Sequence, residues 1–299
     1  MTETLGSSAS IARKSRAGDP AIVIPAVLLG LIALAALAAP LLDTVDPVAI
    51  NPAMRNRTPG FVETLRLADG STQRFTHWMG TDSLGRDIYS RVLYGARVSL
   101  VVGALVAAVS ISVGLVIGLF AGYLRWLDAI VMRVMDGLMA IPPILLALGV
   151  VSLSRAGLPA VVIAIAVPEI PRVVRLVRSV VLSIREEPYV EAAITAGTPL
   201  IPLLWRHVLP NCIAPLIVQA TFVCASAVVV ESILSFLGVG VPPEVPSWGN
   251  VMGGGRQYFR LYPGQILFPG LFLAVTVLCV NLLGDALRDR LDPKLKRRV

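Results

Sequence analysis

Six mainly apolar segments alternate with polar stretches along the chain. A helix needs about 20 apolar residues to cross the ~30 Å hydrocarbon core of a bilayer, and most of these segments reach that length. The pattern therefore predicts an all-α membrane protein with six transmembrane helices. The expected spans are residues 21–42, 98–123, 129–152, 158–170, 213–237 and 266–287.

The first apolar segment has a second interpretation, a signal peptide. Three basic residues precede it, and the run ALAA at residues 36–39 resembles a cleavage site. Its apolar run of about 20 residues exceeds the 7–15 of a typical signal core, which favours a retained span. The chain then divides into a disordered cytoplasmic tail (1–20), the first helix, an extracytoplasmic segment (43–97), a five-helix core (98–287) and a basic cytoplasmic tail (288–299).

Composition and charge indicate that the protein lies in a membrane, and they predict on which side its termini lie. Hydrophobic residues make up 56% of the chain and charged residues 15%, below the ~25% of soluble domains. With six spans, 16 of the 26 Lys and Arg residues lie in tails and loops on the same side of the membrane as the N-terminus. The positive-inside rule then predicts that both termini are cytoplasmic. The net charge of +7 does not indicate a nucleic-acid partner, because the basic residues form no single stripe.

Two of the expected spans are irregular. Pro142 and Pro143 interrupt the third and predict a kink. The fourth has a short apolar core, followed by Arg172, Arg175 and Arg178. A continuous helix over residues 158–184 would be about 40 Å long, so its basic end is expected to project into the cytoplasm. Anchoring at the membrane interface is favoured over substrate contact for these arginines.

The second span carries Gly114, Gly118 and Gly122 at helical spacing, which allows a partner helix to approach closely. Packing within the chain and contact with another subunit remain equal alternatives.

Three acidic residues fall within apolar spans, where an ionised side chain is costly. Asp136 follows Arg133 by one turn and Glu169 precedes Arg172 by one turn, so each acid has a neighbour that can neutralise it. Glu231 has no such neighbour. All three are candidates for the transport pathway or a subunit contact. For Glu231 the alternatives are a hydrogen bond to a neighbouring span and, less favoured, proton coupling.

No catalytic constellation is recognisable. The chain has no G-x-x-x-x-G-K-[ST] phosphate loop, no H-E-x-x-H and no G-x-S-x-G elbow, and its only histidines are His77 and His207. The three cysteines show no metal-ligand spacing. We expect a non-catalytic subunit that binds neither a metal nor another cofactor.

The segment 189–210, YVEAAITAGTPLIPLLWRHVLP, lies between two apolar spans and is amphipathic. An acidic residue suits the start of a short helix, and the alanines after it favour helix. Gly197 and two prolines then predict a turn, followed by a second helix ending near Pro210. Such a helix pair, longer than an ordinary connection, is suited to the cleft of another protein. The candidate contact residues are Tyr189, Glu191, Ala192, Ala193, Ala196, Gly197, His207, Leu209 and Pro210.

This segment resembles the E-A-A motif of inner-membrane permeases of ABC importers. Glu191-Ala192-Ala193, Gly197 and Leu209-Pro210 match it, whereas His207 stands where an aliphatic residue is expected. Histidine there resembles the peptide-type subfamily. Further stretches resemble dipeptide, oligopeptide and nickel permeases, and specifically their C-type subunit. They are G-T-D to S-L at 80–100, E-S to W-G at 231–249 and G-D to K-L at 284–295.

The resemblance implies a MetI-like permease fold with a cytoplasmic coupling helix at about residues 188–210. It also implies a pore shared with a homologous B-type permease in the bacterial inner membrane. Two ATPase subunits, which bind ATP and Mg²⁺, would contact the coupling helix through its residues from Glu191 to Gly197. An extracytoplasmic peptide-binding protein would deliver the cargo. Nickel or glutathione is the alternative cargo within the family.

A self-sufficient channel or secondary transporter is the alternative outside this family. Secondary transporters usually show inverted repeats and paired broken helices, and neither is clear in this sequence.

Overall fold

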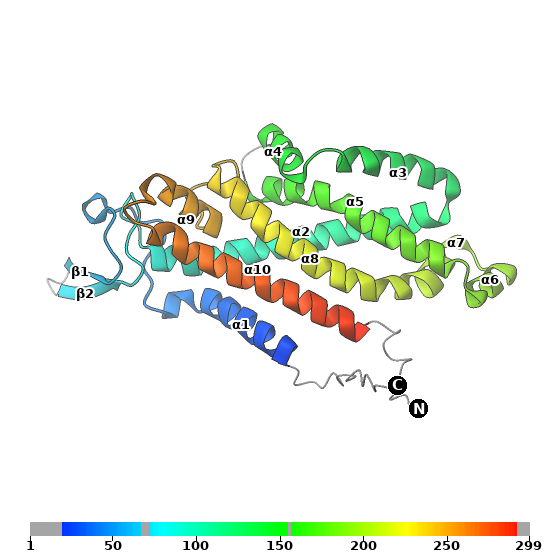
Figure 1. Cartoon of the computed structure of the whole chain (residues 1–299), viewed down its shortest axis with the longest axis horizontal. Coiled ribbons are helices and arrows are strands. Elements are labelled where there is room, and N and C mark those ends of the chain that lie inside the picture. The colour runs from blue at the N-terminus through cyan, green and yellow to red at the C-terminus, as the bar shows by residue number, and fades with distance from the viewer. Residues whose placement is uncertain (1–19, 67–71, 155–156, 292–299) are drawn as a thin grey trace, which may run out of the picture.

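The computed structural model describes residues 20–66, 72–154 and 157–291. Its long helices run along one axis, with a two-stranded hairpin at one end and a short helix pair at the other, whereas α4 points away from this axis (Figure 1). The start of α1 (Pro20–Leu37) and the end of α10 (Gly264–Leu291) both point toward the end that carries the helix pair. Residues 1–19 and 292–299, which include most of the two predicted tails, lie outside the described residues.

Four helical segments in the described part of the chain are long and apolar enough to cross a membrane. They are α1, α2 (Ile88–Tyr123), α10 and the continuous rod Leu200–Phe236, which contains α8 (Leu209–Phe236). Helix α5 (Leu158–Ile184) has the predicted length of 27 residues, but it carries charged residues from Glu169 onward. With α5 and the third segment included, the arrangement is consistent with the six predicted spans.

The third predicted span is two helices rather than one kinked helix. Helix α3 (Arg125–Met139) and α4 (Pro143–Leu153) meet at an angle of 92°. Pro142 and Pro143 both lack an N–H donor, and a proline disfavours helical geometry in the residue before it. Two consecutive prolines therefore end α3 and restart the chain in a new direction, with Pro143 at the first helical position of α4.

Helices α2 and α5 pack with their backbones close together. A Cβ atom added at Gly114, Gly118 or Gly122 would lie 2.5–2.7 Å from the Cβ of Val173, Val177 or Val181, respectively. The glycine stripe therefore receives a row of valines from the same chain. The structure thus places the stripe in packing within the chain.

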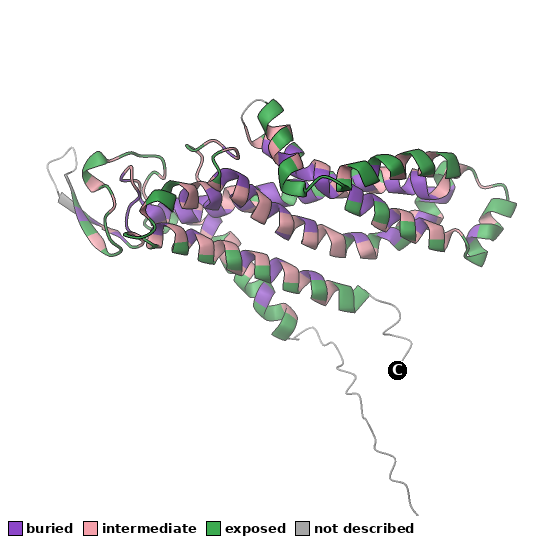
Figure 2. Ribbon diagram, turned by 45° about the horizontal axis from the view of Figure 1, so that its top comes forward, coloured by how far each residue is buried: buried purple, intermediate pink, exposed green. Residues whose placement is uncertain are grey.

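Residues outside the predicted spans form a compact cap at the hairpin end of the bundle (Figure 1). Strands β1 (Phe61–Arg66) and β2 (Thr72–His77) pair antiparallel, and two single 3₁₀ turns, η1 (Ala39–Leu41) and η2 (Pro52–Met54), precede them. Helix α9 (Trp248–Gly255), followed by the turn η4 (Arg256–Tyr258), packs on α8 and α10 at the same end. Burial is greatest along α2, α5 and α8, whereas α1 has long exposed stretches (Figure 2).

His77 joins the hairpin to the start of α2. Its Nδ1 lies 2.8 Å from Asp87 Oδ1 and its Nε2 lies 3.1 Å from Glu63 Oε2, and all three residues are buried. Burial lowers the pKa of the ring, but the hydrogen bonds and charges of Asp87 and Glu63 together raise the pKa above its ordinary value of 6.5. Asp87 also caps α2 by accepting from the backbone N–H of Ser90 at 2.7 Å.

Candidate functional site

The helix pair at the end of the bundle opposite the hairpin begins with α6 (Pro188–Thr195), which a Schellman motif terminates. Gly197 has a φ of +77°, its N–H donates to the carbonyl of Ile194 at 2.9 Å, and the N–H of Thr198 donates to the carbonyl of Ala193 at 3.1 Å. A Cβ added at Gly197 would meet nothing within 4 Å. The glycine is therefore needed for its left-handed backbone, and no neighbour approaches it closely within the chain.

The second helix does not end at Pro210, contrary to the sequence prediction. Helix α7 (Leu200–Leu203) continues through the π-helical turn η3 (Leu204–Val208) directly into α8. Proline inside a helix lacks the N–H and its ring clashes with the carbonyl four residues earlier. A π-helical turn just before Pro210 widens the backbone there, which accommodates the ring without ending the helix.

A small hydrogen-bond cluster ties α6 to the beginning of α8. Asn211 Nδ2 donates to Tyr189 Oη at 3.0 Å and to the carbonyl of His207 at 2.8 Å. Tyr189 Oη donates to the same carbonyl at 3.4 Å. The fully buried Val190 anchors α6 beside these contacts. A force on α6 therefore passes to the base of α8 through both hydrogen bonds and packing.

The outer surface of this pair is available for contact. Glu191, Ala192, Ala196, Gly197 and Pro210 are exposed, whereas Ala193, His207 and Leu209 are partly buried. Large apolar side chains are also exposed here, and the most exposed is Trp205 at 65%. The others are Tyr189, Ile194 and Ile201. An apolar surface on a segment predicted to lie in water is typical of a protein contact.

Only some partners of the acidic residues within the helices were predicted from residue spacing. Glu169 pairs with Arg172 at 3.2 Å, as the spacing predicted, and also accepts from Ser226 Oγ of α8 at 2.9 Å. Asp136 binds Arg175 of α5 at 2.6 Å, so the predicted pairing with Arg133 is wrong. The preference for Arg175 has a geometric reason, because α3 lies along α5 and brings the two side chains face to face.

A further pair, Asp128 with Arg178, closes the same α3–α5 seam, with Nη2 of the arginine 2.7 Å from Oδ2. The three pairs follow each other along α5 at one-turn intervals. Sequence reasoning missed Asp128 and Ser226 because their partners are 50 and 57 residues away along the chain.

Glu231 is fully buried inside the chain rather than on a surface that a pathway or subunit could reach. Ser235 Oγ donates to it at 2.8 Å and Ser99 Oγ of α2 donates at 3.2 Å. The hydroxyl of Ser99 also accepts from the backbone N–H of Trp248 at 3.4 Å. This carboxyl group thus joins α2, α8 and α9, which corresponds to the hydrogen-bonding alternative. The hydrogen bond from Ser235, which lies one turn from Glu231, could be predicted from residue spacing, whereas the bond from Ser99 could not.

The stretch 80–100 builds the joint between the cap and α2. Asp82 accepts from Arg86 Nε at 2.7 Å, and Arg97 donates to the carbonyls of Ala36 at 2.5 Å and Leu37 at 3.0 Å, at the end of α1. Gly85 has a φ of +78°, and a Cβ there would lie 1.8 Å from the carbonyl oxygen of Asn51. Only glycine fits this turn, which explains why the motif carries one.

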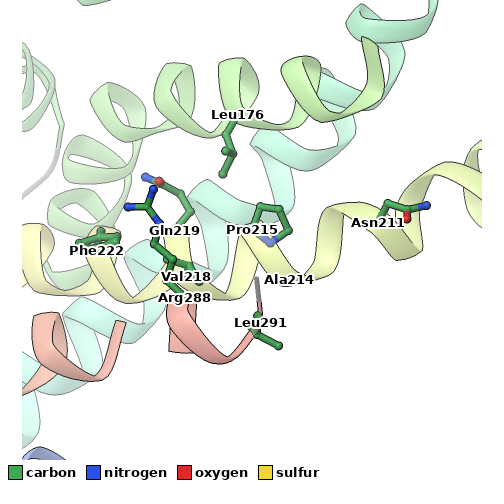
Figure 3. Close-up of a pocket in the computed structure, with 9 residues that line it drawn as sticks. All are labelled: Leu176, Asn211, Ala214, Pro215, Val218, Gln219, Phe222, Arg288 and Leu291. Atoms are coloured by element: carbon green, nitrogen blue, oxygen red, sulfur yellow. The ribbon is translucent and has the colours of Figure 1, made fainter. Parts of the chain in front are cut away.

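A hollow of about 520 Å³ opens between α5, α8 and α10 in the half nearer α6. Figure 3 shows Leu176 of α5 on one side and Arg288 and Leu291 of α10 on the other, with Gln219 and Pro215 of α8 between them. Its lining combines aliphatic side chains with an amide and a guanidinium. Such a mixed lining can accept a solute that has both polar and apolar parts.

Several apolar helices along one axis, closed by a polar cap at one end and an exposed helix pair at the other, define a multi-pass helical membrane protein. Comparison with known proteins gives its family. Residues 114–297 match the family described as binding-protein-dependent transport system inner membrane component. The chain belongs to this family, whose members are the membrane components of ABC importers, and the predicted permease fold is confirmed.

Individual relatives are similar over most of the chain. A probable peptide ABC transporter permease of Sinorhizobium fredii is 51% identical over 279 residues, covering 93% of this chain and 91% of the relative. The dipeptide transport system permease DppC of Alkalihalophilus pseudofirmus is 40% identical, covering 88% and 82%. The glutathione transport system permease GsiD of Pectobacterium atrosepticum is 42% identical, covering 77% and 76%. A crystal structure of an amino acid ABC transporter has the same fold, with a TM-score of 0.50 at 14% identity, covering 68% and 94%.

Proposed function

We propose that this chain is the C-type permease subunit of an ATP-driven importer of dipeptides or short oligopeptides. It forms half of the translocation pathway together with a homologous B-type permease. Two ATPase subunits bind beneath it and hold ATP and Mg²⁺, and this chain itself binds no cofactor. An extracytoplasmic binding protein delivers the peptide. Both termini and the helix pair α6–α7 lie in the cytoplasm.

The exposed helix pair α6–α7 carries this proposal. It projects beyond the bundle, presents the E-A-A motif on its surface and is tied to α8 through Asn211. A rigid projection of this kind can transmit closure of the ATPase subunits to the helices that line the pathway. ATP binding draws the two coupling helices of the permease pair together, and the pore then opens outward to receive peptide.

Peptide cargo is supported by the names of relatives that are 40–51% identical to this chain. Glutathione is the second candidate, because a relative at 42% identity is a glutathione transport permease. Glutathione is itself a modified tripeptide, so the same passage could carry both. Nickel is the remaining cargo within the wider family.

Uptake by a strain that lacks the gene tests the cargo. We expect the deletion to abolish uptake of a radiolabelled dipeptide at low concentration, and the plasmid-borne gene to restore it. Excess unlabelled dipeptide should compete, whereas Ni²⁺ should not. Unchanged dipeptide uptake together with loss of Ni²⁺ uptake would contradict the proposal. The purified chain alone in liposomes should carry no solute, and robust flux from it would favour a self-sufficient channel.

The coupling contact predicts a second outcome. Ala196→Trp adds a large side chain to an exposed position of the helix pair, so it should block docking while leaving the bundle intact. We expect loss of ATPase co-purification and of uptake at normal membrane abundance. Ala53→Trp, the same change at an exposed position of the cap, is the matched control and should retain the ATPase. Co-purification unaltered by Ala196→Trp would count against this docking site.

A further inference from the structure

The outward faces of α2 and α5 can be compared at equal depth. Gly114 lies opposite Val173 and Gly118 lies opposite Val177, which fixes the register of the two helices. The large exposed side chains of α2 are all aliphatic. They are Val101, Leu105, Val109, Val113 and Val116. Ser112 is the one small polar residue that is exposed among them. A mainly aliphatic stripe over about 22 Å of helix is what a lipid-facing surface requires.

Helix α5 presents the opposite chemistry at the same depth. Between Pro171 and Ile184 its exposed residues are Arg172, Arg175, Ser179 and Ser183, which follow one another at helical spacing on one face. Arg172 and Arg175 lie about 21 and 26 Å from the start of α5 and therefore within the ~30 Å apolar layer, whereas Ser179 and Ser183 continue the same face about one and two turns beyond Arg175. We call these four residues the polar face of α5.

Lipid cannot cover the polar face. Charged side chains at this depth are found against the interior of a bundle or against water, because hydrocarbon offers guanidinium groups no hydrogen bonds. Val113 and Val116 at the same level show that this depth is indeed apolar on the side of α2. The polar face must therefore meet water or another protein.

The ion pairs favour water. The side chains of Arg172 and Arg175 remain 47% and 43% exposed although each holds a carboxylate. A guanidinium group has five N–H donors, and Arg175 uses one of them toward Asp136, so the rest require solvent. On the flank of α5, Ser226 of α8 reaches Glu169, and the hollow next to Leu176 adds Gln219 and Arg288. A mainly apolar partner helix would leave these groups unsatisfied.

We propose that the polar face of α5 lines a water-filled passage in the cytoplasmic half of the pathway. Its arginine–carboxylate pairs act there as exchange sites for a zwitterionic solute. A carboxylate of the solute replaces Asp136 on Arg175, and an ammonium group of the solute takes the released Asp136. One positive and one negative group exchange together, so no charge is left uncompensated at apolar depth. This inference rests on the proposed peptide import and adds residues of the passage to it.

Thiol reactivity in the assembled transporter tests the passage. The three native cysteines are first replaced by alanine, and Ser179→Cys is compared with Val116→Cys on the aliphatic stripe of α2. Inverted membrane vesicles are treated with a membrane-impermeant cationic methanethiosulfonate. We expect Ser179→Cys to react at least about ten-fold faster than Val116→Cys, because only a hydrated thiol ionises readily. In these vesicles import runs outward, so the adduct should block the ATP-driven release of peptide that was enclosed in the lumen together with the binding protein.

Two results would overturn the passage. Ser179→Cys could be as unreactive as Val116→Cys, or its adduct could leave peptide transport unchanged. Uptake by the unmodified variant tests the importer separately. An active importer with an unreactive Ser179→Cys therefore defeats this inference alone, whereas absence of peptide uptake defeats the proposed function.

A charge-removal pair tests the exchange. Arg175→Gln leaves Asp136 without its partner and should reduce peptide uptake. The double variant Arg175→Gln with Asp136→Asn removes both charges. If the pair only stabilises the α3–α5 seam, the double variant regains uptake, which would overturn the exchange role. If the pair exchanges with the solute, uptake stays low although ATPase co-purification and thermal stability match the wild type.

Discussion

Helices α2 and α5 share one tightly packed interface, but their outer surfaces differ in chemistry at the same depth. The large exposed side chains of α2 from Val101 to Val116 are aliphatic, with the small Ser112 between them, whereas α5 exposes Arg172 and Arg175 at the level of Val113 and Val116. The two helices run in the same direction and are in register through the glycine–valine contacts. Depth in the bilayer therefore does not explain why their exposed side chains differ. The difference is explained by the medium, lipid or water, that each surface contacts.

This difference shows that the surface of a single subunit can indicate which medium each helix face contacts. Exposure alone would make both surfaces look like unpartnered helix faces. Chemistry at matched depth separates a face for hydrocarbon from a face that needs hydrogen bonds. The pairing of both arginines of the polar face with carboxylates also shows that this face has little net charge. Such a face is suited to a solute with both charges and less suited to an anion.

The largest effect is expected from placing a charge on the aliphatic stripe. Val116→Arg puts a guanidinium group level with Arg175 but on the side of α2 that faces lipid, at a cost of about 2.5–3.5 kcal/mol. We expect a marked loss of the protein from the membrane fraction. Ser179→Arg makes the same addition on the polar face, about one helical turn beyond Arg175, and should keep near-normal abundance. Equal losses for the two variants would break the comparison.

A smaller effect is expected from the interface that the two helices share. In Gly118→Val the new Cβ would lie 2.7 Å from the Cβ of Val177 and 3.0 Å from the carbonyl oxygen of Val174. Overpacking of this kind costs about 1–3 kcal/mol, so the thermal midpoint of the purified protein should fall. Gly137→Val on α3 is the matched control, because a Cβ there meets nothing within 4 Å. Equal midpoints would mean that α2 and α5 are not held in this register.

Local patterns in the sequence predicted those parts of the fold that depend on local physics. The length of α5, the break at Pro142 and the Glu169–Arg172 pair all follow from neighbours within one or two turns. The bounds of α8 and α10 lie within a few residues of the expected spans because apolar length determines them. The E-A-A segment was readable for the same reason, since its alanines, glycine and prolines act within one helix pair.

Contacts between distant segments could not be read in this way. Asp136 binds Arg175, 39 residues away, in preference to the Arg133 on its own helix. Ser99 reaches Glu231 across 132 residues, so the burial of that carboxyl group was visible only in the structure. Pro210 was expected to end a helix, but the π-helical turn before it accommodates the ring. In each case tertiary packing decides between alternatives that the local sequence leaves equal.

The smallest effect on stability is expected at the start of α2. The buried ionisable groups there, His77, Glu63 and Asp87, join α2 to the cap and do not contact α5. The pKa of His77 is raised above 6.5, so its protonated form stabilises the fold in full below pH 6.5. That stabilisation is lost as pH rises through the raised pKa. His77→Gln lacks this contribution while it can still bond Asp87 and Glu63. We therefore expect the thermal midpoint of the wild type to exceed that of His77→Gln by more at pH 5.5 than at pH 8.5. A difference that does not change with pH would show that the ring is held by packing between Phe61 and Phe75 rather than by charge.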